Sequence, residues 1–178
     1  GGSMIDRKKR NEEIMYACAD VFYEKGIEKA TMRNFSEATG YSPATIYQSF
    51  QDKREIVENC LTFSVEKRNE LIAEAVEKNK NTPEKLFKSL QRKEKEMMKW
   101  TVVIVRIITS PYYRDMHGSL EDVSMNAIEK YSDIFDEELI ILFMLYYAAL
   151  NYYVISGSED YFRKEERFIE AEVLKRIK

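Results

Sequence analysis

Apolar side chains recur at helical spacing through most of the chain, beginning with residues 6–25. Five of them fall at positions i, i+3, i+4, i+7 and i+8, which is the spacing of one face of an α-helix. They are Ile14, Ala17, Cys18, Val21 and Phe22. Gly26 marks the expected end of this helix, because glycine commonly follows the last helical turn. The pattern predicts an amphipathic helix that buries one face in a small core.

The next segment, residues 31–56, contains closely spaced helix-start and helix-stop residues. Thr31 can cap the start of one helix through its hydroxyl. Gly40 stands at the expected end of this helix, where the backbone adopts a left-handed conformation that glycine reaches without steric cost. Ser42 can cap a second helix, whose first position is taken by Pro43, where a missing N–H is tolerated. Two short helices joined by a glycine turn are typical of a helix-turn-helix.

A capping-box pattern at Asp52 and Glu55 starts a further helix, which meets no breaker before Asn79. At about 1.5 Å per residue this helix would be roughly 39 Å long, more than a small three-helix domain requires. We therefore expect it to connect two domains, residues 4–57 and residues 58–178.

Proline and β-branched residues shape the middle of the chain. Pro83 restarts a helix, and residues 84–109 keep a helical period. Residues 102–108 taken alone could form a buried strand, because they are rich in β-branched side chains. No second strand candidate lies nearby, so we predict helix there, a further helix over residues 119–135, and an all-α fold of about nine helices.

Residues 139–155 are the most apolar part of the chain. These seventeen residues contain four tyrosines and a single side-chain amide, Asn151. A membrane-spanning helix needs roughly 20 such residues, and acidic residues flank this run on both sides. We therefore expect a buried helix of a soluble protein and no membrane partner. Gly157 ends the helix, and a charged helix over residues 161–178 follows.

The helix-turn-helix is a candidate reader of double-stranded DNA. In this motif the second helix enters the major groove and presents its N-terminal residues to base edges. Here that helix spans residues 43–49. The side chains expected to point outward are Pro43, Ala44, Thr45, Tyr47 and Gln48. The side chains expected to point inward are Phe35, Ala38, Ile46 and Phe50.

Residues 11–57 resemble the DNA-binding domain of the tetracycline-repressor (TetR) family. The resemblance rests on a long, ungapped spacing rather than on one short motif. The matching positions are Ala17, Val21, Phe22, Gly26, Thr31, Met32, Arg33, Ala38, Gly40, Tyr41, Ser42, Thr45, Ile46, Tyr47, Phe50 and Lys53. Family members usually have an aliphatic residue and then alanine where this chain has Phe35 and Ser36.

The resemblance implies a ligand-responsive transcriptional repressor that binds a palindromic operator as a homodimer and has no enzymatic activity. It also implies that the recognition helix and its surroundings supply the DNA contacts. These residues are Thr31, Arg33, Ser42, Pro43, Ala44, Thr45, Tyr47, Gln48 and Lys53. The alternative is a helical interaction protein that keeps the motif without operator binding or ligand response.

Three of these residues have a plain structural alternative. Tyr47 could be a core aromatic, but its place beside outward residues favours a hydroxyl that contacts phosphate. Lys53 opens a helix, where a cation opposes the helix dipole, so a phosphate in front of it would explain its presence better than solvent does. Gln48 is either merely exposed or pairs with adenine.

The charge balance is unusual for a nucleic-acid binder. The formal net charge is −3, and residues 1–57 hold nine Lys/Arg and nine Asp/Glu. Basic residues nevertheless gather at 7–10, at Arg33 and at 53–54. The positions of these side chains matter more for specific DNA binding than the net charge does.

The sequence offers no metal site, cofactor site or catalytic motif. One histidine and two cysteines distant in sequence are too few for zinc or iron ligation, and no phosphate-binding glycine loop or nucleophile–base pair occurs. Cys18 and Cys60 lie in apolar helical settings, which favours a reducing compartment. No apolar signal segment follows the charged residues 7–10, so we expect a cytoplasmic protein.

The apolar, aromatic residues of the second domain suggest an effector site. Arg106 lies among apolar residues, so it should pair with a carboxylate, reach solvent or meet a ligand, with the salt bridge as the default. His117 is expected to be a structural residue rather than a sensor. The candidate contacts for a small, largely apolar effector are Trp100, Arg106, Tyr112, Tyr113, His117, Phe143 and Tyr147.

The last two long helices have more apolar surface than one small domain needs. Two recognition helices are required for two half-sites, which also favours a dimer. The candidate interface residues are Tyr147, Leu150, Val154, Ile169 and Val173.

Overall fold

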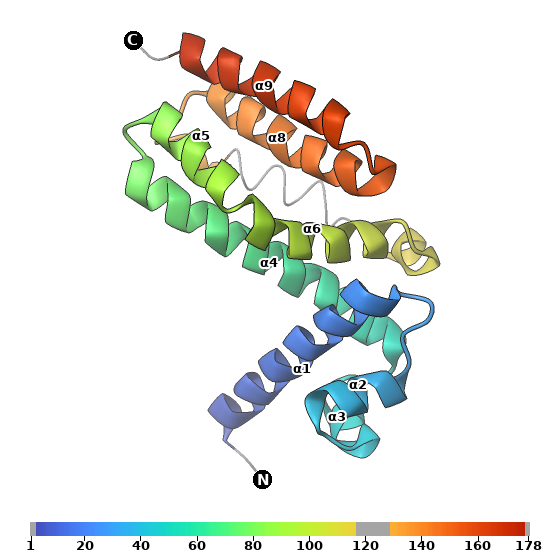
Figure 1. The fold of residues 1–178 in the computed structure, drawn as a ribbon. Helices are drawn as coiled ribbons and strands as arrows, with labels where there is room; N and C mark the ends of the chain where they lie inside the picture. The colour runs from blue at the N-terminus through green and yellow to red at the C-terminus, as the bar shows by residue number, and fades with distance from the viewer. Residues whose placement is uncertain (1–2, 117–128, 177–178) are drawn as a thin grey trace. The chain divides into compact units, whose positions relative to one another are not determined.

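The computed structural model describes residues 3–116 and 129–176, which fold into helices joined by turns (Figure 1). No strand occurs in these two ranges, so the predicted all-α fold is confirmed. The elements are α1 (Met4–Lys25), α2 (Met32–Thr39), α3 (Pro43–Ser49), α4 (Lys53–Asn79), α5 (Pro83–Arg92), α6 (Glu94–Ile108), the 3-10 helix η1 (Pro111–Asp115), α8 (Glu137–Ser156) and α9 (Glu159–Lys175).

Most of the helix ends follow from local side chains, as predicted. Thr31 accepts a hydrogen bond from the Asn34 N–H at 3.2 Å. Gly40 and Gly157 follow α2 and α8 with φ angles of 76° and 69°. Any other residue would be strained in this left-handed conformation by about 1–2 kcal/mol. The long helix α4 runs unbroken from Lys53 to Asn79, as the absence of breakers predicted.

One helix was expected over residues 84–109, but the structure has two. The chain turns at Lys93, whose φ and ψ are −86° and 0°, and whose N–H is shared among the carbonyls of the preceding turn. Neither glycine nor proline marks this turn. The Lys93 ammonium lies 3.1 Å from the Glu74 carboxylate on α4, a contact that local sequence does not reveal. His117 and most of the helix expected over residues 119–135 lie outside the described residues.

The chain divides into two compact units whose composition differs from the domains expected from sequence. Unit 1 contains residues 1–66 together with residues 102–116. Unit 2 contains residues 67–101 and 117–178. The helix-turn-helix thus shares a unit with a segment that follows it by about fifty residues.

The core of unit 1 forms where α1, α2, α3 and the start of α4 meet. The Phe22 and Phe35 rings pack edge to face, with centroids 5.4 Å apart. Cys18 and Cys60 are buried free thiols. Burial raises the pKa of Cys60 to about 12, so this thiol stays protonated and unreactive at neutral pH.

The core of unit 2 is largely aromatic. Helices α8 and α9 lie side by side, and α5 packs against α9 (Figure 1). The fully buried Tyr146 ring lies 5.2 Å from Phe87 and 6.1 Å from Phe162, measured between centroids. Arg163 on α9 donates hydrogen bonds to both carboxylate oxygens of Glu94 at 2.9 and 3.0 Å, and this pair connects α9 to α6.

Helix α8 has two different apolar faces. One face lies in the core of unit 2 and includes Leu139, Phe143 and Leu150. Among the described residues α8 is the one helix long and apolar enough to cross a membrane, with a mean hydropathy of 1.8. Its second face is exposed and continues onto α9. We call this the outer apolar face: Ile141, Leu145, Tyr152, Ile155, Tyr161 and Phe168.

Candidate nucleic-acid interface

The recognition helix α3 is anchored on one side and exposed on the other. Ile46 is fully buried, whereas Tyr47 is 49% exposed and Gln48 is exposed as well. Thr45 is half-buried, and its hydroxyl lies 3.0 Å from the Ser42 hydroxyl at the start of the helix. Pro43 and Ala44 are exposed. The first two turns of α3 therefore present a short polar and aromatic surface.

One residue expected to point inward does not. Ala38 is exposed, although Phe35, Ile46 and Phe50 are buried as predicted. Helix α2 has only eight residues, and Phe35 is its one fully buried side chain.

The two positions where the chain departs from the TetR pattern each make a specific contact: Phe35 with α1, and Ser36 across the turn between α2 and α3. The Phe35 ring packs against Phe22, as described above. The Ser36 hydroxyl donates a 2.6 Å hydrogen bond to the carbonyl of Tyr41. Alanine could not make this contact, so Ser36 adds a direct link across the turn.

Helix α1 braces α3 at both ends. Before α3, the Tyr41 hydroxyl donates a 2.6 Å hydrogen bond to Glu13, which raises the pKa of Tyr41. At the end of α3, Arg10 donates to the Ser49 hydroxyl at 3.4 Å. These contacts join residues far apart in sequence, so sequence patterns gave no sign of them. They connect both ends of α3 to α1.

Thr31 and Arg33 lie at the start of α2. Thr31 serves as the N-cap, and its hydroxyl contacts the Asn34 side chain at 2.9 Å. The Arg33 side chain is 87% exposed and pairs with Glu37 at 2.8 Å. Such an exposed pair contributes little to stability, so Arg33 can exchange Glu37 for a phosphate at small cost.

Lys53 already has partners within unit 1. Its ammonium donates to the backbone carbonyl of Glu28 at 3.2 Å and lies 5.6 Å from the centroid of the Tyr112 ring. Partial burial lowers the pKa of Lys53. An ammonium has three N–H donors, so two remain for an anion in front of α4.

Two arginines connect the segment 102–116 to the helices around the DNA-binding motif. Arg54 on α4 pairs with Asp115 of η1 at 2.9 Å. Arg106 on α6 donates to the carbonyls of Phe22 and Tyr23, at 2.8 Å for Phe22. The default expectation of a carboxylate partner for Arg106 is therefore not met. The guanidinium instead caps the C-terminal end of α1, where the negative end of the helix dipole also favours a cation.

Replacing Arg106 by methionine should destabilise unit 1. The change keeps the apolar stem but removes two charge-assisted hydrogen bonds, each of a kind worth about 1.5–3 kcal/mol. We expect a lower unfolding midpoint and faster hydrogen exchange in the last turn of α1. Arg114→Met, at an exposed arginine of η1, is the control and should change neither. Equal exchange rates in α1 for the two variants would contradict this role.

The candidate effector residues do not form one cluster within either unit. Arg106, Tyr112 and Tyr113 belong to unit 1, whereas Trp100, Phe143 and Tyr147 belong to unit 2. Of the latter, Phe143 lies in the aromatic core, 6.4 Å from Phe87 between centroids. The Tyr147 ring lies beside Arg68, with 5.7 Å between the ring centroid and the Arg68 Cζ atom.

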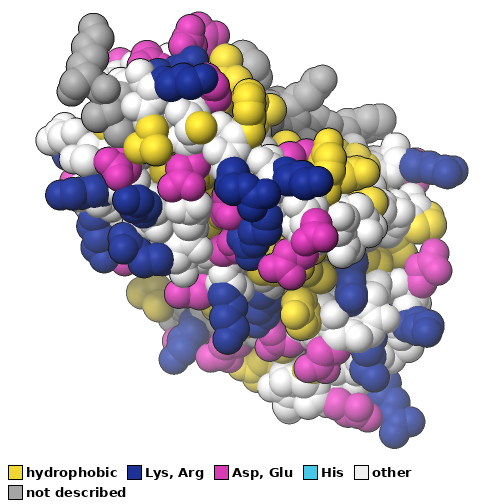
Figure 2. Space-filling view, turned by 45° about the horizontal axis from the view of Figure 1, so that its top comes forward, with side chains coloured by type: hydrophobic (Ala, Val, Ile, Leu, Met, Phe, Trp, Pro, Cys, Tyr) yellow, Lys and Arg dark blue, Asp and Glu magenta, His cyan; other side chains and the backbone are white. Residues whose placement is uncertain are grey.

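Basic residues do not form one broad patch on the face drawn in Figure 2. Figure 2 shows acidic and basic side chains interspersed on the face in view, with apolar groups between them. Residues 1–57 are balanced in charge as well, with nine Lys/Arg and nine Asp/Glu. Specific DNA contacts must therefore come from a few placed side chains rather than from a broad positive field.

Comparison with known proteins connects this geometry to a family. Residues 14–60 match the sequence model of the bacterial regulatory proteins of the tetR family. No curated protein matches the chain.

Two solved structures share the fold over nearly the whole chain. A protein from Mesorhizobium loti assigned to the TetR family of transcriptional regulators is 15% identical with a TM-score of 0.64, and the match covers 95% of each chain. The TetR-family transcriptional regulator PfmR from Thermus thermophilus is 20% identical with a TM-score of 0.57, over 93% of this chain and 98% of that one. The helix-turn-helix sequence and the helical fold therefore agree: residues 14–60 match the tetR family of bacterial regulatory proteins, and the chain as a whole shares the fold of two TetR-family regulators.

Proposed function

We propose that this DNA-binding regulator is a homodimeric repressor that binds a palindromic operator and leaves it when a small effector binds. The observation that carries the proposal is the geometry of α3. Its N-terminal turns are exposed, its buried Ile46 fixes it to the core, and α1 braces it at both ends. A rigid, exposed helix of this kind fits the major groove.

A dimer supplies the second recognition helix. The interface residues expected from sequence require revision, because Leu150, Ile169 and Val173 are at most 3% exposed within the protomer. Side chains buried in their own core cannot form the centre of a contact with another copy. We therefore place the interface on the outer apolar face of the same two helices, α8 and α9.

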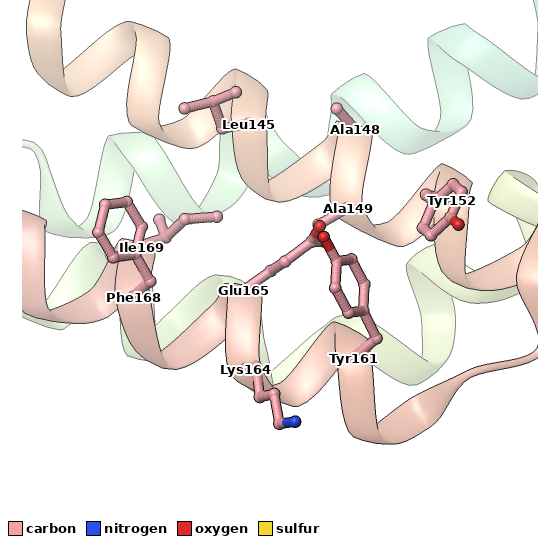
Figure 3. Close-up of a pocket in the computed structure, with 9 residues that line it drawn as sticks. All are labelled: Leu145, Ala148, Ala149, Tyr152, Tyr161, Lys164, Glu165, Phe168 and Ile169. Atoms are coloured by element: carbon pink, nitrogen blue, oxygen red, sulfur yellow. The ribbon is translucent and has the colours of Figure 1, made fainter.

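The outer apolar face contains a shallow groove that suits such a contact. The groove has a volume of about 450 Å³ and lies between α8 and α9 (Figure 3). Leu145 and Tyr152 line one side, and Tyr161 and Phe168 line the other. Glu165 extends from α9 toward α8, and its Oε2 atom is buried without a hydrogen-bond partner (Figure 3). A donor from a second copy would satisfy it.

An effector response fits the contacts of α6 and η1. Residues 102–116 touch α1 through Arg106 and the start of α4 through Tyr112 and Asp115. Any ligand that shifts α6 would act on these contacts, and so on the placement of α3. The expected consequence is a coupling free energy between the effector and the operator.

Selection of binding sites from random DNA tests the proposal. The protein should enrich an inverted repeat whose half-sites are about 34–36 Å apart. Affinity for that site should fall with rising salt. The alternative, a helical interaction protein, predicts no enrichment over random sequence, and this outcome would refute the repressor proposal.

Two substitutions should separate backbone contacts from base contacts. Lys53→Ala should weaken binding to operator and random DNA alike, and should reduce the salt slope by about one unit per subunit, because a phosphate contact carries no sequence information. Gln48→Ala should cost about 1–3 kcal/mol on the operator and little on random DNA. Competition titrations over a salt series measure both. If Gln48→Ala left the specific-to-random ratio unchanged while Lys53→Ala altered it, the orientation of α3 on DNA would be the reverse of the one proposed.

A further inference from the structure

Unit 2 contains a buried arginine that has no carboxylate partner in the part of the chain that the structure describes. Arg68 on α4 is only 7% exposed. Its Nη1 donates to the Asn151 side-chain oxygen on α8 at 3.2 Å and to the Thr101 hydroxyl on α6 at 3.5 Å. Its Cζ atom lies 5.7 Å from the centroid of the Tyr147 ring. All these partners are neutral, and none of the ion pairs among the described residues includes Arg68.

Such a charge is costly to bury. A guanidinium does not lose its proton in proteins, so Arg68 cannot escape the cost by becoming neutral. Removing an ion from water costs several kcal/mol, and neutral oxygens offset only part of this. An arginine in this setting is energetically unfavourable as a core residue alone. It becomes favourable when a bound anion neutralises its charge.

The free edge of the guanidinium has the geometry of a carboxylate site. Both hydrogen bonds of Arg68 use Nη1. The opposite edge, formed by Nε and Nη2, makes no hydrogen bond to any residue that the structure describes, and Nε is buried. These two nitrogens present parallel N–H donors that match the two oxygens of a carboxylate. The Tyr147 hydroxyl is a second buried donor, and it too has no hydrogen-bond partner within residues 3–116 and 129–176.

The surroundings of this edge are apolar. Leu71 and Ile72 follow Arg68 by three and four residues on α4, so they share its face of the helix. Met144 precedes Tyr147 by three residues on α8. All three are only partly buried against the core. Partly buried apolar side chains therefore lie within one helical turn of Arg68 on α4 and of Tyr147 on α8.

We propose that unit 2 binds a small amphiphile whose carboxylate is held by the Nε–Nη2 edge of Arg68 and the Tyr147 hydroxyl, and whose hydrocarbon body lies along Leu71, Ile72 and Met144. This inference rests on the proposed effector response, which it deepens by naming the chemical class of the effector. The carboxylate neutralises Arg68, which an apolar or cationic molecule cannot do.

Binding of matched acids and amides tests the site. Hexanoate, octanoate and decanoate are titrated below their micelle-forming concentrations, against hexanamide, octanamide and decanamide. Calorimetry measures binding, and Trp100, the only tryptophan and a sequence neighbour of Thr101, gives a fluorescence signal. At least one acid should bind about tenfold or more tightly than its amide. If no acid exceeds its amide, the wild-type protein alone overturns the proposal.

Variants then assign the preference to the named residues. Arg68→Met should abolish the preference for the acid, and Tyr147→Phe should weaken acid binding several-fold while leaving amide binding unchanged. Arg92→Met, on α5 and outside the proposed site, is the control and should keep the full preference. Ligand-free Arg68→Met should melt no lower than the wild type, since it removes an uncompensated charge. An Arg68→Met protein that still prefers acids would place the anion elsewhere and refute the site.

The operator assay keeps this inference distinct from the repressor proposal. If the protein binds its operator but no acid binds better than its amide, only the carboxylate site fails. If the acids bind through Arg68 but no operator exists, the site stands and the repressor proposal fails.

Discussion

Replacing Phe168 by glutamate should convert the protein into a monomer with little affinity for its operator. Phe168 is 63% exposed within the protomer and lines the groove between α8 and α9. A two-fold interface uses the same patch on both subunits, so one substitution changes two side chains of the interface. Burying a phenylalanine is worth about 1.5–3 kcal/mol, and two copies together about 3–6 kcal/mol. The dimer dissociation constant should therefore rise by about 100-fold or more.

Sedimentation at micromolar concentration measures this change, and circular dichroism confirms that the helices remain folded. Ile5→Glu introduces the same charge at another exposed apolar residue, 79% exposed and outside the outer apolar face, and should leave the dimer intact. A dimeric Phe168→Glu protein with wild-type affinity would show that the copies associate through a different surface.

Replacing Phe35 by alanine should cost unit 1 about 3–5 kcal/mol. Phe35 is fully buried, and its ring packs against Phe22. The cavity left behind cannot close easily, because the Ser36–Tyr41 hydrogen bond fixes the adjacent turn. Total stabilities of domains are only about 5–15 kcal/mol, so a loss of this size should leave much of the DNA-binding unit unfolded near body temperature.

Phe35→Leu is the matched control, because aliphatic residues are usual at this position in the family. It should cost roughly 1–1.5 kcal/mol, as expected for a change of shape with most of the volume kept. Urea titrations that follow the α1 and α2 signals measure both variants. Equal losses for alanine and leucine would mean that the aromatic contact, not the filled volume, determines the stability of this unit.

Local signals predicted the fold well. The caps at Thr31 and Ser42, the glycines that follow α2 and α8, and the full length of α4 were all visible in the sequence. Each of them depends on residues within one helical turn. The exposed face of α3 was predicted for the same reason, since helical spacing alone decides which side chains share a side.

The features that sequence did not predict depend on distant contacts. The turn at Lys93, the bracing of α3 by α1 and the capping of α1 by Arg106 all join residues that lie far apart in the chain. The inner and outer faces of α8 could not be told apart either. A helix that is apolar all round has no periodicity to indicate which face meets the core.

The composition of unit 1 limits how this DNA-binding module can be transplanted. Because residues 102–116 belong to the same unit as the helix-turn-helix, a fragment cut after residue 66 would lack the arginine that caps α1 and the aspartate that holds Arg54. A hybrid regulator that takes only the first 66 residues would need an equivalent of Arg106 from its new host. Hybrids of related proteins should therefore fold more often when the α6–η1 segment is transferred together with the N-terminal helices.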